Sequence, residues 1–226
     1  MNGQIESLSS SEFQYQYAGL QYFGSMSASI AHEIKNALAI TNENAGLMED
    51  LSLMVIKSGQ PLDPERIARL SKKVMEQIKR ADNIVKKMSR FAHSIDDPVK
   101  VISLSEVVEL TLDLGRRSAA AFNITFAPVN CDVPVSIQTN PFMLMNLLWL
   151  LIKSSLKRVN DGKIIEVALS KSAADGSKGV SISILNLLPC KDKLDEQDQI
   201  DKLAKLLNAD VDTKNDDKIV MNIITN

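Results

Sequence analysis

The chain has 226 residues, a formal net charge of −2 at pH 7 and 24% charged residues, with a pI near 5.8. This length is enough for one large domain or two small ones, each with a buried core. The near-neutral charge gives no reason to expect nucleic acid or an anionic membrane as a partner. Cys131 and Cys190 have neither CxxC spacing nor a histidine nearby, so no zinc site or disulfide framework is predicted.

The N-terminal residues carry no targeting signal. Residues 1–11 lack the basic and apolar stretches of a signal peptide. No run of about 18 apolar residues occurs anywhere in the chain. We therefore expect no membrane segment and, with only two cysteines, a reducing, cytoplasmic setting.

A long helix is predicted over residues 12–57, because apolar residues recur there at three- and four-residue spacing. The pattern is carried by Phe23, Met26, Ile30, Ile34, Leu38, Ala45, Met48, Leu51 and Val55. The sequence Ser58-Gly59-Gln60-Pro61 is expected to end the helix, since glycine and proline are the usual stop signals.

One histidine departs from this apolar stripe. At about 100° per residue, His32 lies about 200° from both Ile30 and Ile34 and is predicted to face solvent. Glu33 follows it, and Asn36 lies one turn further along on the same side. Imidazole is a good nucleophile near neutral pH, and a carboxylate beside it can orient the ring or accept its proton. Periodicity and spacing alone still favour a solvated histidine without a task.

A second helix is predicted to begin at Asp63-Pro64, which has the form of an N-cap followed by a proline at the first helical position. Its apolar residues alternate three and four apart as Ile67, Leu70, Val74, Ile78, Ala81, Ile84, Met88 and Phe91. Two such helices form a hairpin that leaves much of both apolar stripes exposed, so a homodimeric four-helix bundle is expected. The alternative is that the helices pack on the C-terminal half of the same chain.

The sequence Asp96-Asp97-Pro98 is expected to separate a helical domain, residues 1–96, from a second domain, residues 97–226. In the second domain strands alternate with helices, which indicates an α/β sandwich and an α+β protein overall. Ser103 with Glu106 has the form of a capping box, and Asn140-Pro141 that of an N-cap. The predicted helices cover residues 103–121, 140–159 and 195–207, and the predicted strands cover 99–102, 124–127, 135–137, 164–170, 180–185, 209–213 and 218–225.

The stretch His32-Glu33-Ile34-Lys35-Asn36 resembles the phospho-acceptor box of two-component histidine kinases and histidine phosphotransferases. Small and polar residues precede it and a small apolar run follows it, as in that family. One departure is Ala37, where many members carry a proline that bends the helix. The resemblance implies that His32 is a nucleophile that accepts a phosphoryl group, assisted by Glu33 and Asn36.

The second half resembles the ATP-binding domain of the same kinases in the order of its elements and in residues 140–148, but it lacks that domain's chemistry. The family's later asparagines, the last of which coordinates Mg²⁺, correspond to Leu150 and Ser154. The family's Asp-x-Gly-x-Gly turn corresponds to Leu185-Asn186-Leu187-Leu188-Pro189, which has no carboxylate and no glycine. We therefore expect a degenerate kinase-type sandwich that binds no ATP and holds no cofactor or metal of its own.

Together these resemblances imply a dimeric histidine phosphotransferase of a two-component phosphorelay. His32 would take a phosphoryl group from the aspartate of one response-regulator receiver domain and pass it to another, with Mg²⁺ supplied by the receiver. Glu33 would orient the ring and accept a proton. Helical spacing puts Asn36, Ala39, Ile40 and Glu43 beside His32 as docking residues for the receiver.

Three other functions stay open on the sequence. Glu33 and Asn36 match the Glu-x-x-Asn pair with which such kinases help water attack a phospho-aspartate, so the chain could act as a phosphatase. A pseudokinase scaffold would bind a partner through its altered pocket, and an active ATP-dependent kinase ranks last. His93 is expected to be a cation at a helix end, and Trp149, Met143 and Met145 are expected to be packing residues.

Overall fold

The computed structural model describes residues 10–59, 61–131, 134–159, 163–172, 179–189, 194–213 and 217–224, and Cys190 lies outside these ranges. The chain divides into two compact units, of which the first combines Met1–Met26 with Phe91–Asn226 and the second is Ser27–Arg90. Within the described ranges no helix combines the length and the apolar character needed to cross a bilayer. No cluster of three or more potential metal ligands occurs among the same residues.

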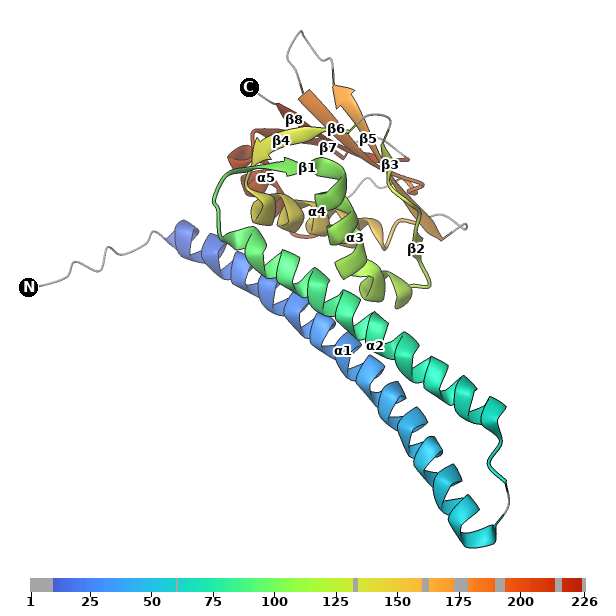
Figure 1. Ribbon diagram of the computed structural model, residues 1–226. Helices are drawn as coiled ribbons and strands as arrows, with labels where there is room; N and C mark the ends of the chain where they lie inside the picture. The colour runs from blue at the N-terminus through green and yellow to red at the C-terminus, as the bar shows by residue number, and fades with distance from the viewer. Residues whose placement is uncertain are drawn as a thin grey trace, which may run out of the picture. The chain divides into compact units, whose positions relative to one another are not determined.

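Two long helices, α1 (Ser10–Ser58) and α2 (Pro64–Ala92), form the predicted hairpin, and Ser27–Arg90 is a unit of its own (Figure 1). The connection between them uses the signals expected from the sequence. Gly59 adopts φ +67°, and its N–H donates to the Val55 carbonyl at 2.9 Å. Asp63 Oδ1 accepts from the N–H groups of Glu65 and Arg66 at 2.9 and 3.2 Å and so caps α2.

The α/β unit is built on a main sheet with the strand order β2-β5-β6-β8-β7, in which β3 also pairs with β5. Strands β2 and β3 run parallel to β5, and the other pairs are antiparallel. A separate antiparallel pair joins β1 to β4. The strands are β1 (Lys100–Ser103), β2 (Thr125–Phe126), β3 (Asn130–Cys131), β4 (Ser136–Thr139), β5 (Ile164–Ser172), β6 (Gly179–Leu185), β7 (Ala209–Asp212) and β8 (Ile219–Ile224).

Helices α3 (Leu104–Ala120), α4 (Pro141–Ser155) and α5 (Gln197–Leu206) form the second layer of this sandwich (Figure 1). Strand β6 buries every second residue, Val180, Ile182 and Ile184, against that layer. Helix α4 is buried almost all round, as expected for a helix that is apolar on every side. The α+β class predicted from the sequence is therefore confirmed.

Three local features differ from the sequence prediction. Ser103 precedes α3 in an extended conformation, but its side chain makes no capping hydrogen bond and instead lies 3.2 Å from Ser105 Oγ. Helix α4 ends at Ser155 and not near residue 159, because Arg158 and Val159 turn to meet the chain after β6. Strand β3 is too short and too polar to have been recognised from its pattern. At Asn140 the prediction holds, since Asn140 Oδ1 accepts from the Met143 N–H at 2.8 Å.

An aromatic cluster joins the start of α1 to the α/β unit. Phe91 is fully buried, and its ring meets Tyr22 edge-on with centroids 5.6 Å apart and stacks on Phe23 at 5.3 Å. Phe142, at the start of α4, lies 5.5 Å from Tyr22. Such pairs contribute about 0.5–1.5 kcal/mol beyond the area they bury. The start of α1 and the last residues of α2 therefore belong to the α/β unit, while the part between them pairs as a hairpin.

Gly115 lets α3 approach Trp149 of α4 closely. A Cβ placed on Gly115 would lie 2.5 Å from Trp149 Cζ3 and 3.2 Å from Cε3. We predict that Gly115→Ala lowers the free energy of unfolding by about 1–3 kcal/mol, the usual cost of overpacking, although alanine favours a helix. Urea unfolding at equilibrium measures this directly.

The matched control is Gly24→Ala in α1, where an added Cβ meets no atom within 4 Å. Here only helix propensity changes, so this variant should gain about 0.5–1 kcal/mol. Equal effects of the two substitutions would contradict the close contact between Gly115 and Trp149.

Tyr22 gives the fold a specific alkaline sensitivity. Burial raises the pKa of the Tyr22 hydroxyl well above its ordinary value near 10. The unfolded chain therefore loses this proton at lower pH than the folded chain, and Tyr22 lowers the free energy of unfolding as pH rises above about 10. We predict that Tyr22→Phe removes this part of the alkaline loss of stability. Urea unfolding at a series of alkaline pH values measures it, and an unchanged alkaline loss of stability in Tyr22→Phe would contradict the prediction.

Candidate functional site

The orientation of α1 in the hairpin is fixed by a buried stripe that repeats every seven residues. Ile30 is 5% exposed, Ala37 0% and Asn44 6%. The polar members of this stretch are satisfied within the helix, because Thr41 Oγ1 donates to the Ala37 carbonyl at 2.9 Å and Asn44 Nδ2 donates to the Ile40 carbonyl at 2.7 Å. The stripe therefore determines which residues of α1 can face water.

The residues predicted for the site lie on the other side of the same helix. His32, Asn36, Ala39 and Glu43 are all exposed and follow one another at spacings of four, three and four residues, which is one helical face. Ile40 is 37% exposed, and Glu33 is half-buried. The sequence thus anticipated a single accessible surface around the imidazole, which we call the His32 face and define by His32, Asn36, Ala39, Ile40 and Glu43.

The His32 ring is exposed, and no hydrogen bond joins it to Glu33 or to any other residue in the described parts of the chain. Ala37, at the position where the resemblance leads one to expect proline, is fully buried in the stripe. Both its N–H and its small side chain are compatible with the uninterrupted α1 helix.

The second histidine occupies a different environment. His93 begins the short 3-10 helix η1 (His93–Ile95) after α2 and is exposed. Its Nδ1 lies 2.7 Å from Asp96 Oδ2, which makes it one half of a surface ion pair when protonated. It therefore differs from His32 in having a fixed carboxylate partner.

Helix α4 buries a leucine and a serine at the two positions where the resemblance leads one to expect amide side chains. Leu150 is 5% exposed and Ser154 is 7% exposed. Leucine offers no oxygen to a hard cation, and one serine hydroxyl is a poor substitute for an amide ligand.

The turn after β6 uses its backbone donors inside the protein. The Leu187 N–H donates to the Asp217 carbonyl at 3.0 Å, and the Leu188 N–H donates to the Arg158 carbonyl at 2.5 Å. Asn186 takes the left-handed conformation at φ +66°, and its side chain donates to Glu166 Oε1 at 3.0 Å. Donors that already have protein acceptors are not available to cradle a phosphate.

Arg158 was missed by sequence reasoning. It is 7% exposed, and its Nε donates to the Leu188 carbonyl at 3.2 Å. Its Nη1 and Nη2 have no hydrogen-bond partner within the described part of the chain. A lone arginine late in an apolar helix looks like a solvated residue in sequence, so only its burial in the fold reveals it.

Two ion pairs join α4 and the turn that follows it to the segment that opens α5. Lys153 Nζ lies 3.1 Å from Glu196 Oε1, and Lys157 Nζ lies 2.5 Å from Asp195 Oδ2. The hydrogen bond and charge of Lys157 lower the pKa of Asp195, and the same contact raises the pKa of Lys157. Both pairs are solvent-exposed, so they position the segment more than they stabilise it.

No protein-family model and no curated protein matches the sequence. Solved structures are similar in fold. The Acinetobacter baumannii histidine kinase AdeS has 11% identity and a TM-score of 0.47, and the alignment covers 86% of this chain and 98% of that one. The cytoplasmic segment of histidine kinase QseC has 14% identity and a TM-score of 0.44 over 66% of this chain and 95% of that one. The catalytic domain of histidine kinase ThkA has 12% identity and a TM-score of 0.43 over 56% and 96%.

These three proteins are all histidine kinases, but identities of 11–14% and TM-scores below 0.5 do not transfer an activity. The function of this chain therefore has to be argued from its own residues.

Proposed function

We propose that the chain is a dimeric histidine phosphotransferase of a two-component phosphorelay, with His32 as the residue that carries the phosphoryl group. The observation that supports this most directly is the exposure of an unpaired imidazole on the His32 face. The ring nitrogen must approach the phosphorus on a second protein in line with the bond that breaks. A buried or ion-paired ring cannot do this.

The proposed reaction moves one phosphoryl group between proteins. The imidazole lone pair attacks the phosphorus of a receiver phospho-aspartate, a P–N bond forms, and the P–O bond to the aspartate breaks, releasing its carboxylate. The reverse step passes the group to a second receiver. Mg²⁺ held by the receiver neutralises the negative charge on the oxygens of the transferring phosphoryl group. Glu33 orients the His32 ring and accepts its proton.

An outside source of phosphate is favoured by the chemistry of the α/β unit. Leu150 and Ser154 supply neither of the amides found in the resembling family, and the N–H groups of Leu187 and Leu188 are engaged by protein carbonyls. In this proposal ATP is not the donor, and the chain holds no nucleotide or metal of its own.

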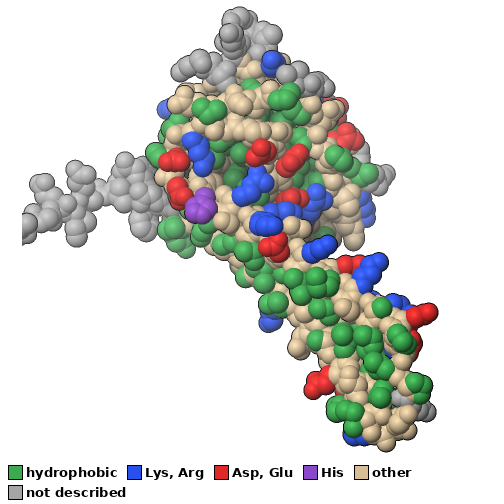
Figure 2. Space-filling view, in the orientation of Figure 1, with side chains coloured by type: hydrophobic (Ala, Val, Ile, Leu, Met, Phe, Trp, Pro, Cys, Tyr) green, Lys and Arg blue, Asp and Glu red, His purple; other side chains and the backbone are tan. Residues whose placement is uncertain are grey.

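A second copy of the chain is the proposed partner of the hairpin. Within the unit Ser27–Arg90 several apolar residues of the predicted stripes stay exposed, including Leu38 at 56% and Ile78 at 49%. Val85 and Ile56 add to this surface at 52% and 77%. Figure 2 shows hydrophobic side chains gathered along the hairpin with few charges between them. Pairing two hairpins into a four-helix bundle would cover such a surface, whereas monomeric proteins rarely expose one this long.

Hydrolysis is the second candidate, because Asn36 lies one turn from His32 on the same exposed face. An amide there can position a water against a receiver phospho-aspartate without any histidine intermediate. The phosphatase and the transferase share a docking surface, so only the fate of the phosphate separates them.

We predict that the chain becomes labelled when it is mixed with a receiver domain carrying ³²P-phospho-aspartate, and that His32→Gln abolishes labelling. The label should be stable to alkali and labile to acid, as a phosphoramidate is. Glu33→Gln should slow transfer by roughly 10²-fold or more, the usual size of a lost acid–base contribution.

His93→Gln is the matched control, because His93 is the only other histidine of the chain and is also exposed. It should transfer at the wild-type rate. Labelling that survives in His32→Gln contradicts the transferase proposal, and release of inorganic phosphate by His32→Ala at the wild-type rate would favour hydrolysis instead. Labelling directly from Mg-ATP would support the kinase.

We also predict that the chain, of 24.9 kDa, runs as a dimer in light scattering coupled to size exclusion, and that Ile78→Asp makes it a monomer. A charge in the proposed bundle core would be desolvated without a partner. Asn83→Asp, on the exposed opposite face of α2, adds the same charge and should remain dimeric. If the wild-type chain is a monomer, no second copy covers the stripe. If Ile78→Asp stays dimeric, the dimer forms through another surface.

A further inference from the structure

A lysine lies beside the proposed phospho-acceptor on the surface of α1. Lys35 follows His32 by three residues, and both side chains are exposed. In an α-helix this spacing corresponds to about 4.5 Å along the axis and about 60° around it. Residues three apart are neighbours on a helix surface, with Cβ atoms about 5–6 Å from each other. The ammonium group of Lys35 can therefore reach a group bonded to the His32 ring.

The direction of side chains in a helix brings the lysine toward the ring. A helical side chain leans toward the N-terminus and covers the residues three and four positions before it. For Lys35 these residues are His32 and Ala31. For His32 they are Ser29 and Ala28, whose small side chains leave room for a bulky group on the ring.

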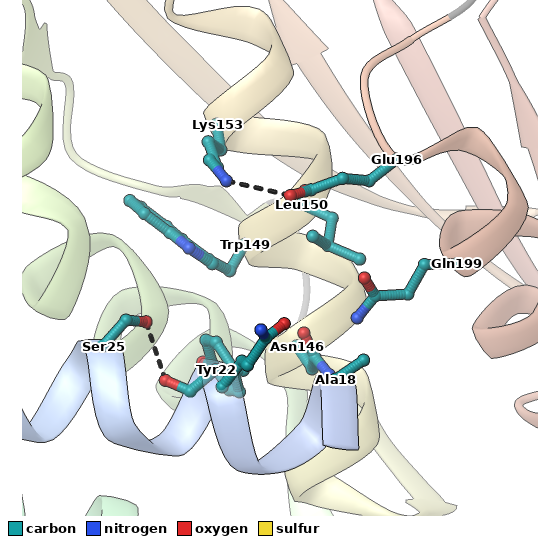
Figure 3. A pocket seen from close by; sticks show the side chains of 10 residues that line it. Ala18, Tyr22, Ser25, Asn146, Trp149, Leu150, Lys153, Glu196 and Gln199 are labelled. Carbon is teal, nitrogen blue, oxygen red and sulfur yellow. Dashed lines mark hydrogen bonds and ion pairs between the residues drawn. The ribbon is translucent and has the colours of Figure 1, made fainter. Parts of the chain in front are cut away.

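Lys35 has no acidic partner. No ion pair or hydrogen bond joins its Nζ to another residue in the described ranges. Lys153 differs, because its Nζ lies 3.1 Å from Glu196 Oε1, drawn as a dashed line in Figure 3. Glu33 is two residues from Lys35, a spacing at which helical side chains do not face each other. The residues at three- and four-residue spacing carry no negative charge and are Ala31, His32, Leu38 and Ala39.

A phosphoryl group on His32 would supply the missing negative charge. Phosphorylated side chains carry about −1.5 to −2 charges at pH 7 and three acceptor oxygens. Within one helical turn of His32, residues 28–36, Lys35 is the only cation in the sequence. We propose that Lys35 binds the phosphoryl group carried by His32 and lengthens the life of the phosphorylated chain, an inference that rests on the proposed phosphotransfer.

The lifetime matters because the group must stay on His32 until the second receiver arrives. Loss of a phosphoryl group from imidazole is acid-catalysed, since the ring takes up a proton before it can leave. The P–N bond then breaks, a water oxygen bonds to phosphorus, and the neutral ring is released. A positive charge beside the phosphoryl oxygens attracts them and opposes the uptake of that proton. Lys35 therefore slows this loss.

The test needs no receiver, because phosphoramidate, a small chemical donor, can load His32 directly. The unprotonated ring nitrogen attacks phosphorus, the bond from phosphorus to the donor nitrogen breaks, and ammonia leaves. Every variant of the full chain also carries His93→Gln, so that His32 is the only histidine that can be loaded. The decay of the phosphorylated chain is then followed by ³¹P NMR near neutral pH, in low salt and in about 1 M salt, which screens charges within about 3 Å.

Three variants separate the charge of Lys35 from its other effects. Lys35→Gln should shorten the lifetime about 2-fold in low salt and leave it unchanged in high salt, the size expected for an exposed pair at this spacing. Lys35→Arg keeps the charge and should keep the wild-type lifetime. Lys57→Gln removes the same charge from an exposed site far along the same helix and should also decay as the wild type does.

A lifetime that is shortened only in Lys35→Gln, and only in low salt, supports the proposal. Equal lifetimes in all variants, or an equal loss in Lys35→Gln and Lys57→Gln, overturn it. Slower transfer from a phosphorylated receiver to Lys35→Gln with a wild-type lifetime also overturns it and assigns Lys35 to docking. Failure of phosphoramidate to load His32 overturns it as well. If His32 is loaded by phosphoramidate but by no receiver, the phosphotransferase proposal fails while the lifetimes still decide the role of Lys35.

Discussion

The burial of one stripe of α1, repeated every seven residues through Ile30, Ala37 and Asn44, is the constraint on which the rest of the structure depends. A helix can hide only part of its circumference in a hairpin, so whatever lies opposite the stripe must face water. His32 and Asn36 owe their exposure to this geometry and not to any local feature of their own. The same geometry leaves Leu38 and Ile78 uncovered, and these are the side chains that a second hairpin would bury in the proposed dimer.

Much of this architecture was predictable because it is local. The glycine at 59, Asp63-Pro64 and Asn140-Pro141 act through neighbours within a turn or two, and all three appear as expected. The apolar stripe of α1 was predicted less well, because Leu38 is exposed and the polar Asn44 is buried. The alternation of strand β6 and the apolar character of α4 likewise follow from the residues themselves. The exposed side of α1 follows from the rotation of about 100° per residue in a helix. The exposure of the His32 face could therefore be predicted from the sequence.

What escaped prediction depends on contacts between distant residues. The capping of α3 by Ser103 failed because the hydroxyl turns to Ser105, a choice between two neighbours that spacing does not decide. Strand β3 exists only because β5 offers it a partner. Tyr22 and Asn146 line the same pocket although they are more than a hundred positions apart in the chain. Arg158 is a buried arginine because the chain after β6 packs against it. None of these pairings leaves a periodic trace in the sequence.

The division of the chain also bears on how it is made. The α/β unit is assembled from both sides of the hairpin, Met1–Met26 and Phe91–Asn226, so the hairpin is an insertion nested inside it. During synthesis the first turns of α1 emerge long before Phe91 and Phe142, the rings that receive Tyr22. Tyr22 therefore meets these two rings only after the end of α2 and the start of α4 have been synthesised. The start of α1 and the start of α4 thus depend on each other to bury their aromatic rings, whereas Ser27–Arg90 forms a compact unit of its own.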